Sequence, residues 1–313
     1  MNDHFKMKKY FIYSIGIVIL FFSSCEEDIN LNLVGGEQKI VIEGNIENGE
    51  FAQVTVTKNS PLTEPVDFSG ILVKNASVFV SNGVMVDTLL LDTLFTTAVP
   101  FVYVGSKIKG VPGQTYSLTV IVDNNTYWAT TFIPEPIKLD TVWWKPTPPE
   151  TEYGTATARL TDPPAPGNSY KWFSKLPTRV VYDPETNTPI IQNRRYLSPR
   201  GSTFDDQFIN DKSFEFSYYK ATDQTESIIE TDDDNSPEGQ RRRGLYKNTD
   251  TIYIKFCTLD DKAAKFYKTF EAASESSGNP FASPSRIISN INGGALGVWA
   301  GFGATYDTIM PPK

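Results

Sequence analysis

The feature that most constrains this chain is an apolar run near its start. Two lysines, Lys8 and Lys9, precede residues 10–22, which are almost purely apolar, and two serines then lead into Cys25. Thirteen residues in an α-helix rise about 20 Å, which is too short for a hydrocarbon core of about 30 Å. A short apolar run with basic residues before it and small residues after it is typical of a signal peptide. We therefore predict that residues 1–24 are removed from the mature protein.

The position of Cys25, directly after the small residues, resembles the lipidation site of a bacterial lipoprotein, although Phe22 stands where leucine is usual. That resemblance implies a mature chain that begins at Cys25 and carries fatty acyl chains such as palmitate. One acyl chain anchors a protein only marginally, whereas several hold it stably on a membrane. Glu26, Glu27 and Asp28 resemble the acidic export tract of surface lipoproteins. The alternatives are an ordinary secretory signal with a chance cysteine, and an acidic stretch that is only a solvated tether.

Composition removes several classes of function from the mature chain. Without residues 1–24 the net charge falls from −8 to −10, which argues against a nucleic-acid or anionic-membrane patch. The single histidine, His4, leaves with the signal peptide, so catalysis by Ser-His-Asp or Cys-His and any histidine-ligated metal are excluded. Cys257 is the one cysteine besides Cys25, and it lies in an alternating run that predicts a buried small hydrophobe. We expect no cofactor and no metal.

Alternating β-branched segments separated by turn residues fill the first half. They fall at residues 39–44, 52–57, 76–81, 84–91, 103–108, 115–122 and 127–133. Asn82-Gly83 is the clearest hairpin signal among the turns between them. About seven such strands in about 100 residues predict an immunoglobulin-like β-sandwich over residues 38–133, after a lipidated tether at residues 25–37.

Five prolines mark residues 134–150 as a Pro-rich, semi-rigid connector. Trp143 and Trp144 lie inside it. Two neighbouring indoles could stack on a sugar, and they are our candidates for ligand contact. The alternative is that one of the rings fills a seam between domains.

The second half, residues 151–313, predicts a β-rich domain with one α-helix. Strand patterns occur at residues 155–160, 169–173, 213–220 and 252–257. Residues 260–276 predict the helix, which Asp260 or Asp261 caps and whose apolar stripe packs on a sheet: Ala263, Phe266, Tyr267, Phe270 and Ala273. The glycine-rich stretch after it predicts a terminal strand in close backbone contact, with Ile291, Leu296 and Val298 in the core of this domain.

A set of short motifs spread along the chain resembles the domain of unknown function 4249 family, lipoproteins of Bacteroidetes. The motifs are Cys25 with Ile29 and Leu31, Ile40-Val41-Ile42-Glu43-Gly44, Thr161-Asp162-Pro163 before Tyr170, Asp205-Asp206-Gln207, Asn279-Pro280-Phe281, and Ser289-Asn290-Ile291 before the glycine-rich stretch. The resemblance implies an outer-membrane or surface lipoprotein that is often encoded beside a TonB-dependent outer-membrane transporter. It implies no catalytic residues.

Three functions fit these observations. The first is a non-enzymatic accessory or ligand-capturing partner of a TonB-dependent transporter, anchored in the outer membrane by lipid and facing the cell exterior. The second is a structural or adhesive surface protein. The third is a glycosidase that uses carboxylates alone, since paired Asp or Glu need no histidine. Asp205 and Asp206 are adjacent, so on a strand they would point to opposite faces, which is the wrong geometry for such a pair.

Overall fold

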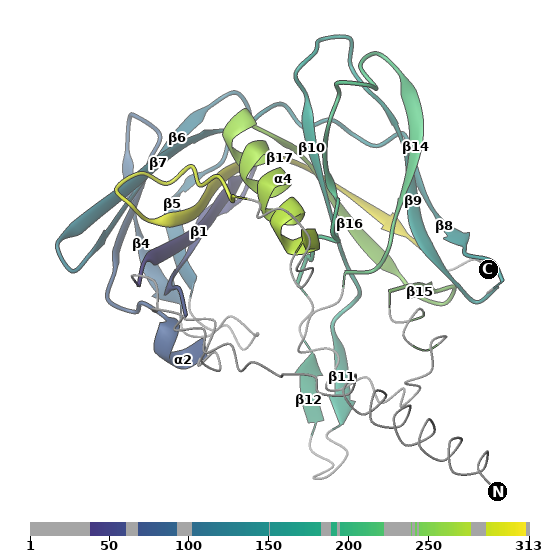
Figure 1. Ribbon diagram of the computed structural model, residues 1–313, viewed down its shortest axis with the longest axis horizontal. Helices are drawn as coiled ribbons and strands as arrows, with labels where there is room; N and C mark the ends of the chain where they lie inside the picture. Colours follow the sequence, from purple (N-terminus) through teal and green to yellow (C-terminus); the bar gives the residue numbers. More distant parts are fainter. Residues whose placement is uncertain are drawn as a thin grey trace, which may run out of the picture. The chain divides into compact units, whose positions relative to one another are not determined.

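The computed structural model describes residues 38–60, 68–92, 102–149, 151–182, 189–192, 195–221, 239, 242, 244–276 and 286–310. The described residues are mainly β, as predicted, and include one long α-helix (Figure 1). Within the described ranges, no helix is long and apolar enough to cross a membrane.

The first half consists of strands joined mostly by short turns. Its elements are β1 (Ile40–Glu47), β2 (Phe51–Lys58), the short helix α2 (Phe68–Ile71), β3 (Ser77–Ser81), β4 (Val86–Asp92), β5 (Val102–Lys109), β6 (Thr115–Val122) and β7 (Asn125–Phe132). The predicted hairpin is confirmed, because β3 pairs antiparallel with β4 around Gly83, whose φ is 85°. All seven predicted strands of this half are present.

In the described part of the second half there are ten strands and the long helix. Its elements are β8 (Thr141–Pro146), β9 (Tyr153–Thr161), β10 (Ser169–Lys175), β11 (Arg179–Tyr182), β12 (Pro189–Gln192), β13 (Thr203–Asp205), β14 (Ser213–Tyr218), β15 (Tyr246–Lys247), β16 (Ile252–Leu259), α4 (Asp261–Ser276) and β17 (Leu296–Ile309). Part of the predicted connector at residues 134–150 therefore forms a strand. The correction has a local reason: the five residues of β8 before Pro146 are not proline, so they keep the backbone N–H groups that a strand needs to pair with β9.

One large sheet includes strands from both halves. Its order is β13-β10-β16-β17-β1-β2-β5-β4-β3-β6-β7, and a smaller sheet holds β14, β9, β15 and β8. The last strand, β17, lies between β16, which it pairs antiparallel, and β1, which it pairs in parallel. The division into domains at residues 38–133 and 151–313 stays a prediction, and the sheet runs across it.

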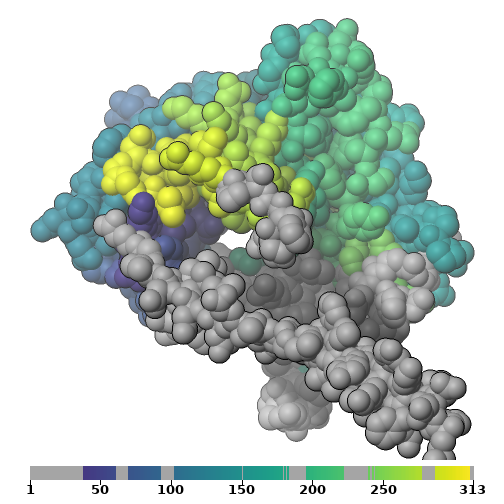
Figure 2. Space-filling view, in the orientation of Figure 1, coloured from purple at the N-terminus to yellow at the C-terminus, as the bar shows by residue number. Residues whose placement is uncertain are grey.

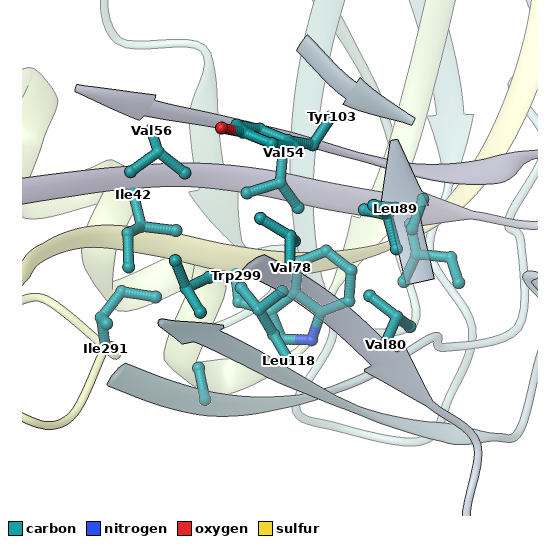
Figure 3. Close-up of a cluster of buried hydrophobic side chains, with 14 of the residues drawn as sticks. Ile42, Val54, Val56, Val78, Val80, Leu89, Tyr103, Leu118, Ile291 and Trp299 are labelled. Carbon is teal, nitrogen blue, oxygen red and sulfur yellow. The ribbon is translucent and has the colours of Figure 1, made fainter. Parts of the chain in front are cut away.

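The first core lies between β1 and β2 on one side and β3 and β6 on the other. Strand β4 connects the two layers. Its first residues pair with β3 in one layer, and its last residues pair with β5 in the other. Figure 3 shows Trp299 of β17 among Val54, Val78 and Leu118 in this core. The Trp299 indole is fully buried and donates its N–H to the Tyr116 carbonyl at 3.0 Å. An immunoglobulin-like topology for this half stays a prediction.

Two further cores lie on opposite faces of the β10-β16-β17 part of the sheet. On one face, Tyr170, Trp172 and Phe256 pack against β9 and β14 of the smaller sheet. On the other face, α4 covers β16 and β17. Ala263 and Phe266 of α4 belong to the same buried cluster as Phe302 of β17. Figure 1 shows α4 lying across these strands. The prediction that the helix packs on a sheet is therefore confirmed.

The start of α4 is tied to the first half by its capping residue. One carboxylate oxygen of Asp260 accepts the N–H of Ala263 at 2.7 Å, which is the predicted cap. The other oxygen accepts the N–H of Phe132 at 2.9 Å and the hydroxyl of Thr131 at 2.5 Å, both on β7. The cap therefore fixes the helix both to its own first turn and to a strand far away in sequence.

Three predicted core residues are placed differently. Ile291 is buried in the first core rather than the second, because the segment before β17 crosses β7 at Asn292. Leu296 is 41% exposed, since it lies at the first position of β17, before the strand passes under α4. Phe270 on α4 is 45% exposed, and its ring stacks on that of the buried Phe266 with 5.9 Å between the ring centres. Val298 does pack beside the helix, as predicted.

The glycines of β17 explain how this strand lies so close to its neighbours. A side chain at Gly301 would come within 2.3 Å of the Phe132 carbonyl oxygen, and one at Gly297 within 1.9 Å of the Ile42 carbonyl oxygen. Real side-chain carbons do not approach backbone oxygen so closely, so both positions require glycine. The predicted terminal strand in close backbone contact is confirmed.

Candidate functional site

The predicted lipidation and export residues lie outside the described residues. Cys25, Glu26, Glu27 and Asp28 belong to this group. The two tryptophans are described, and both lie on β8. Trp144 packs against the second core and donates its indole N–H to the Tyr246 carbonyl at 3.3 Å. Neighbouring residues of a strand point to opposite faces, so the two rings form no joint platform. Contact of the half-buried Trp143 with a ligand stays a prediction.

A group of tyrosines and lysines gathers on the helix-covered face of the large sheet, beyond the end of α4. We call it the tyrosine–lysine surface, and it consists of Lys175, Tyr196, Tyr253, Lys255 and Tyr306. The strand register brings it together, because Lys175 pairs with Tyr253 and Lys255 pairs with Tyr306. Side chains at paired positions stand on one face of a sheet, so four of the five project the same way.

Glu47 of β1 holds the inner edge of this surface. Its carboxylate accepts Lys255 Nζ at 2.5 Å through one oxygen and the Tyr306 hydroxyl through the other. The Glu47 and Lys255 side chains are 8% and 13% exposed, whereas Tyr306 is 52% exposed. Burial, and then the hydrogen bond to Glu47, raise the pKa of Tyr306. The phenol is therefore a neutral donor at physiological pH and not a base.

The outer part of the surface is aromatic and cationic. Lys175 Nζ lies 4.6 Å from the ring centre of Tyr196 and 5.9 Å from that of Tyr253, and the Tyr196 and Tyr306 rings are 5.9 Å apart. A shallow pocket continues from Lys175, and Arg195 and Lys220 also line it. Flat aromatic faces and cations at the rim suit contact with a polar ligand or another protein, and the basic pocket suits an anionic group.

The tyrosine–lysine surface was not predicted from the sequence, although Tyr253 and Lys255 gave a local signal for it. In the run 252–257 we weighed the apolar side chains and Cys257, while Tyr253 and Lys255 occupy the alternate positions. Which strand lies beside them depends on pairing between distant segments. Cys257 itself is fully buried, and burial raises the pKa of its thiol to about 12, which confirms the predicted buried small hydrophobe.

A second polar cluster lies beneath α4 and is closed to solvent. Lys171 Nζ donates to Glu271 at 2.7 Å and to the Thr203 hydroxyl at 2.9 Å, and it lies 4.4 Å from the ring centre of Tyr267. Lys171 is 2% exposed and the nearby Ser202 is fully buried. Burial lowers the pKa of Lys171, although Glu271 opposes the shift. The contacts of this buried cluster attach α4 to the sheet.

The carboxylates weighed for glycoside hydrolysis are held by structural contacts. Asp205 forms an ion pair with Lys268 of α4, and the hydrogen bond from Lys268 lowers the pKa of that carboxyl. Asp206 is buried, and one of its oxygens accepts the N–H groups of Gly167 and Asn168 at 2.7 and 2.8 Å. Asp162 accepts the hydroxyl of Tyr170. These motif residues join two loops to each other and to the helix.

Metal ligation has no candidate in the part of the chain that the structure describes. There, no group of three or more histidine, cysteine, aspartate or glutamate residues is placed to hold a metal ion.

The described residues form a mainly β protein whose tyrosine–lysine surface is aromatic and cationic. The chain belongs to the family described as a domain of unknown function, DUF4249, whose sequence profile matches residues 26–306. The resemblance predicted from the short motifs is thus confirmed. No curated protein matches the chain.

Proposed function

We propose that this protein is an outer-membrane lipoprotein, displayed at the cell surface, that captures a ligand for, or otherwise assists, a TonB-dependent transporter without catalysing a reaction. The observation that carries the proposal is the signal segment ending at Cys25. Lipid on Cys25 holds the folded chain at a membrane, and Glu26, Glu27 and Asp28 are the residues we propose for its export to the outer face. A tethered protein binds a membrane neighbour at high effective concentration, so a modest interface is sufficient.

The tyrosine–lysine surface is the face that we propose for this contact. Tyrosine is enriched in protein interfaces because it offers a large, rigid ring together with a polar tip. Here Lys175, Tyr196 and Tyr253 are half-buried and Tyr306 is exposed, so the rings are held in place yet remain within reach. Glu47 and Lys255 form an ion pair below the rings, and Lys175, Arg195 and Lys220 add positive charge beside them, which suits an acidic group on the partner.

The carboxylate-only glycosidase has less support. Two catalytic carboxylates must face one substrate from either side of the scissile bond. Asp205 and Asp206 instead bind Lys268 and two backbone N–H groups. A structural or adhesive role would use the same anchor and the same exposed face. The two proposals differ in the partner, because only the first requires a TonB-dependent transporter.

Lipidation at Cys25 is tested by metabolic labelling with an alkyne fatty acid. We expect the wild-type chain and Cys257→Ser to carry the label, and Cys25→Ser to lose it and leave the membrane fraction. Cys257 is fully buried, so it is the matched control for a cysteine that lipid cannot reach. Label that persists in Cys25→Ser would contradict the anchor.

A further inference from the structure

Several exposed apolar side chains gather where the first strand begins. They are Phe270 on α4, Ile287 and Ile288 in the segment before β17, and Leu296 at the start of β17, with 45%, 42%, 39% and 41% of their surface exposed. We call them the tether-side patch. Figure 2 shows the yellow residues around the start of β17 against the purple start of β1.

Hydrogen bonds and strand pairing connect the residues of this patch. The Ile288 N–H donates to the Thr269 hydroxyl at 3.0 Å, which places Ile288 beside the helix turn that carries Phe270. The Ser289 hydroxyl donates to the Gly297 carbonyl at 2.9 Å, and Leu296 pairs with Val41 of β1. The patch therefore runs from α4 across the start of β17 to the start of β1.

The chain that leads to Cys25 leaves the fold beside this patch. Gln38 and Lys39 directly precede β1, and twelve residues separate Gln38 from Cys25. Twelve residues span about 40 Å when fully extended, and about 20 Å on average as a flexible coil. Lipid on Cys25 therefore keeps the start of β1 close to a membrane.

Charge near the patch favours the same occupant. Lys39 and Arg286 are exposed and Lys58, which pairs with Ile40, is half-buried, on a chain whose net charge is −8. Glu43, two positions after Val41, is the exposed carboxylate on this part of β1. Long basic side chains lay their stems along apolar surface and extend their charge towards phosphate groups at a membrane surface.

We propose that the tether-side patch lies against the surface of the lipid membrane in which Cys25 is anchored. The inference rests on the lipid anchor of the proposed function. It fixes which end of the β1-β17 pair faces the membrane, and it explains why Phe270 and Leu296 stay apolar without being buried in a core.

The chain offers a matched control on other strands, at the tip of the β3–β4 hairpin. Val84 and Met85, at the tip of the β3–β4 hairpin, are 89% and 50% exposed. The last residue of β4, Asp92, pairs with Val102 at the first end of β5. The other end of β5, Lys109, pairs with Phe51, which is the residue of β2 farthest from Lys58. The hairpin tip therefore lies away from the start of β1, although it is equally apolar.

The test uses the full lipidated chain in vesicles of phosphatidylethanolamine and phosphatidylglycerol. A fluorophore is attached at Ile288→Cys, at Arg286→Cys as a second position, or at Met85→Cys as the control. Cys257 does not take the label, because it is fully buried and the pKa of its thiol is raised to about 12. We expect nitroxide lipids to quench the label at positions 288 and 286 several-fold more strongly than at position 85.

The outcomes distinguish failure of the membrane-facing patch from failure of the lipid anchor. A chain that fails to float with the vesicles would refute the lipid anchor and the proposal with it. A chain that floats but shows equal or no quenching at positions 288 and 286 would refute the membrane-facing patch alone, including the case in which another protein shields those labels.

Discussion

At the scale of single residues, the most consequential contact is the ion pair between Lys171 and Glu271. Their side chains are 3% and 11% exposed, so both charges have left bulk water. Such a pair adds little to stability compared with an apolar pair of similar volume, yet removing one partner leaves a buried charge uncompensated. The pair therefore matters mainly for the position of α4, because Glu271 also accepts the N–H and hydroxyl of Thr203 on β13.

The test uses a chain that starts at Glu26 and therefore lacks Cys25. We predict that Glu271→Leu lowers its free energy of unfolding by about 3–5 kcal/mol, because Lys171 is left buried without its carboxylate partner. Denaturant unfolding measures the change. The double variant Lys171→Met/Glu271→Leu should regain much of the loss. A double variant that is less stable than Glu271→Leu would show that the pair itself, and not the uncompensated charge, carries the effect.

The roles of the family-motif aspartates could be predicted only in part. Adjacency alone indicated that Asp205 and Asp206 point apart, and the structure agrees, because one binds Lys268 on α4 and the other binds the loop before β10. Neither partner could be named from the sequence, since Lys268 and Gly167 come close only through tertiary packing. The same limit hid the tyrosine–lysine surface.

At the scale of elements, β17 organises the described chain. It is 14 residues long, pairs with β1 and β16, and contributes to all three cores through Trp299, Val298 and Ile309. Its glycines allow it to pass directly over β7, where Gly301 approaches Phe132. A strand with this many neighbours has no tolerance for added side-chain volume.

Gly301→Val should therefore cost at least about 3 kcal/mol, since the new side chain meets backbone oxygen that cannot move aside. Gly83→Ala is the control: nothing lies within 4 Å of a side chain there, and the cost is only that of a left-handed backbone, about 1–2 kcal/mol. Thermal melts of both variants compare the two costs. Equal melting temperatures would contradict the close approach of β17 and β7.

Local patterns predicted most strands and the helix, but not how the strands are ordered. Alternation at residues 115–122 and the cap at Asp260 act over a few residues, so both could be recognised. The parallel pairing of Val41 with Leu296 has no local signal, because the two strands lie far apart in the sequence and the pattern of each strand fits many partner strands. Ile291 was assigned to the wrong core for this reason.

At the scale of the whole molecule, the shared sheet predicts that the first half does not fold alone. A fragment of residues 26–133 lacks Trp299 of β17, and also Ala295 and Ile291 of the segment before β17, which all belong to the first core. It also leaves the edge of β1 unpaired, a position prone to aggregation. We expect this fragment to show no cooperative thermal transition by circular dichroism, whereas the chain of residues 26–313 melts in one transition. A fragment that melts cooperatively would instead support an independent domain at residues 38–133.

The central functional claim is that the tyrosine–lysine surface meets a TonB-dependent transporter at the cell surface. The most direct measurement places p-benzoylphenylalanine at Tyr306 or Tyr253 in intact cells and identifies the cross-linked protein by mass spectrometry. Phe208, which is 80% exposed on a loop away from this surface, is the control position. We predict that light joins positions 306 and 253, but not position 208, to an outer-membrane transporter. Absence of a transporter adduct at positions 306 and 253, or equal yield at position 208, would contradict the claim.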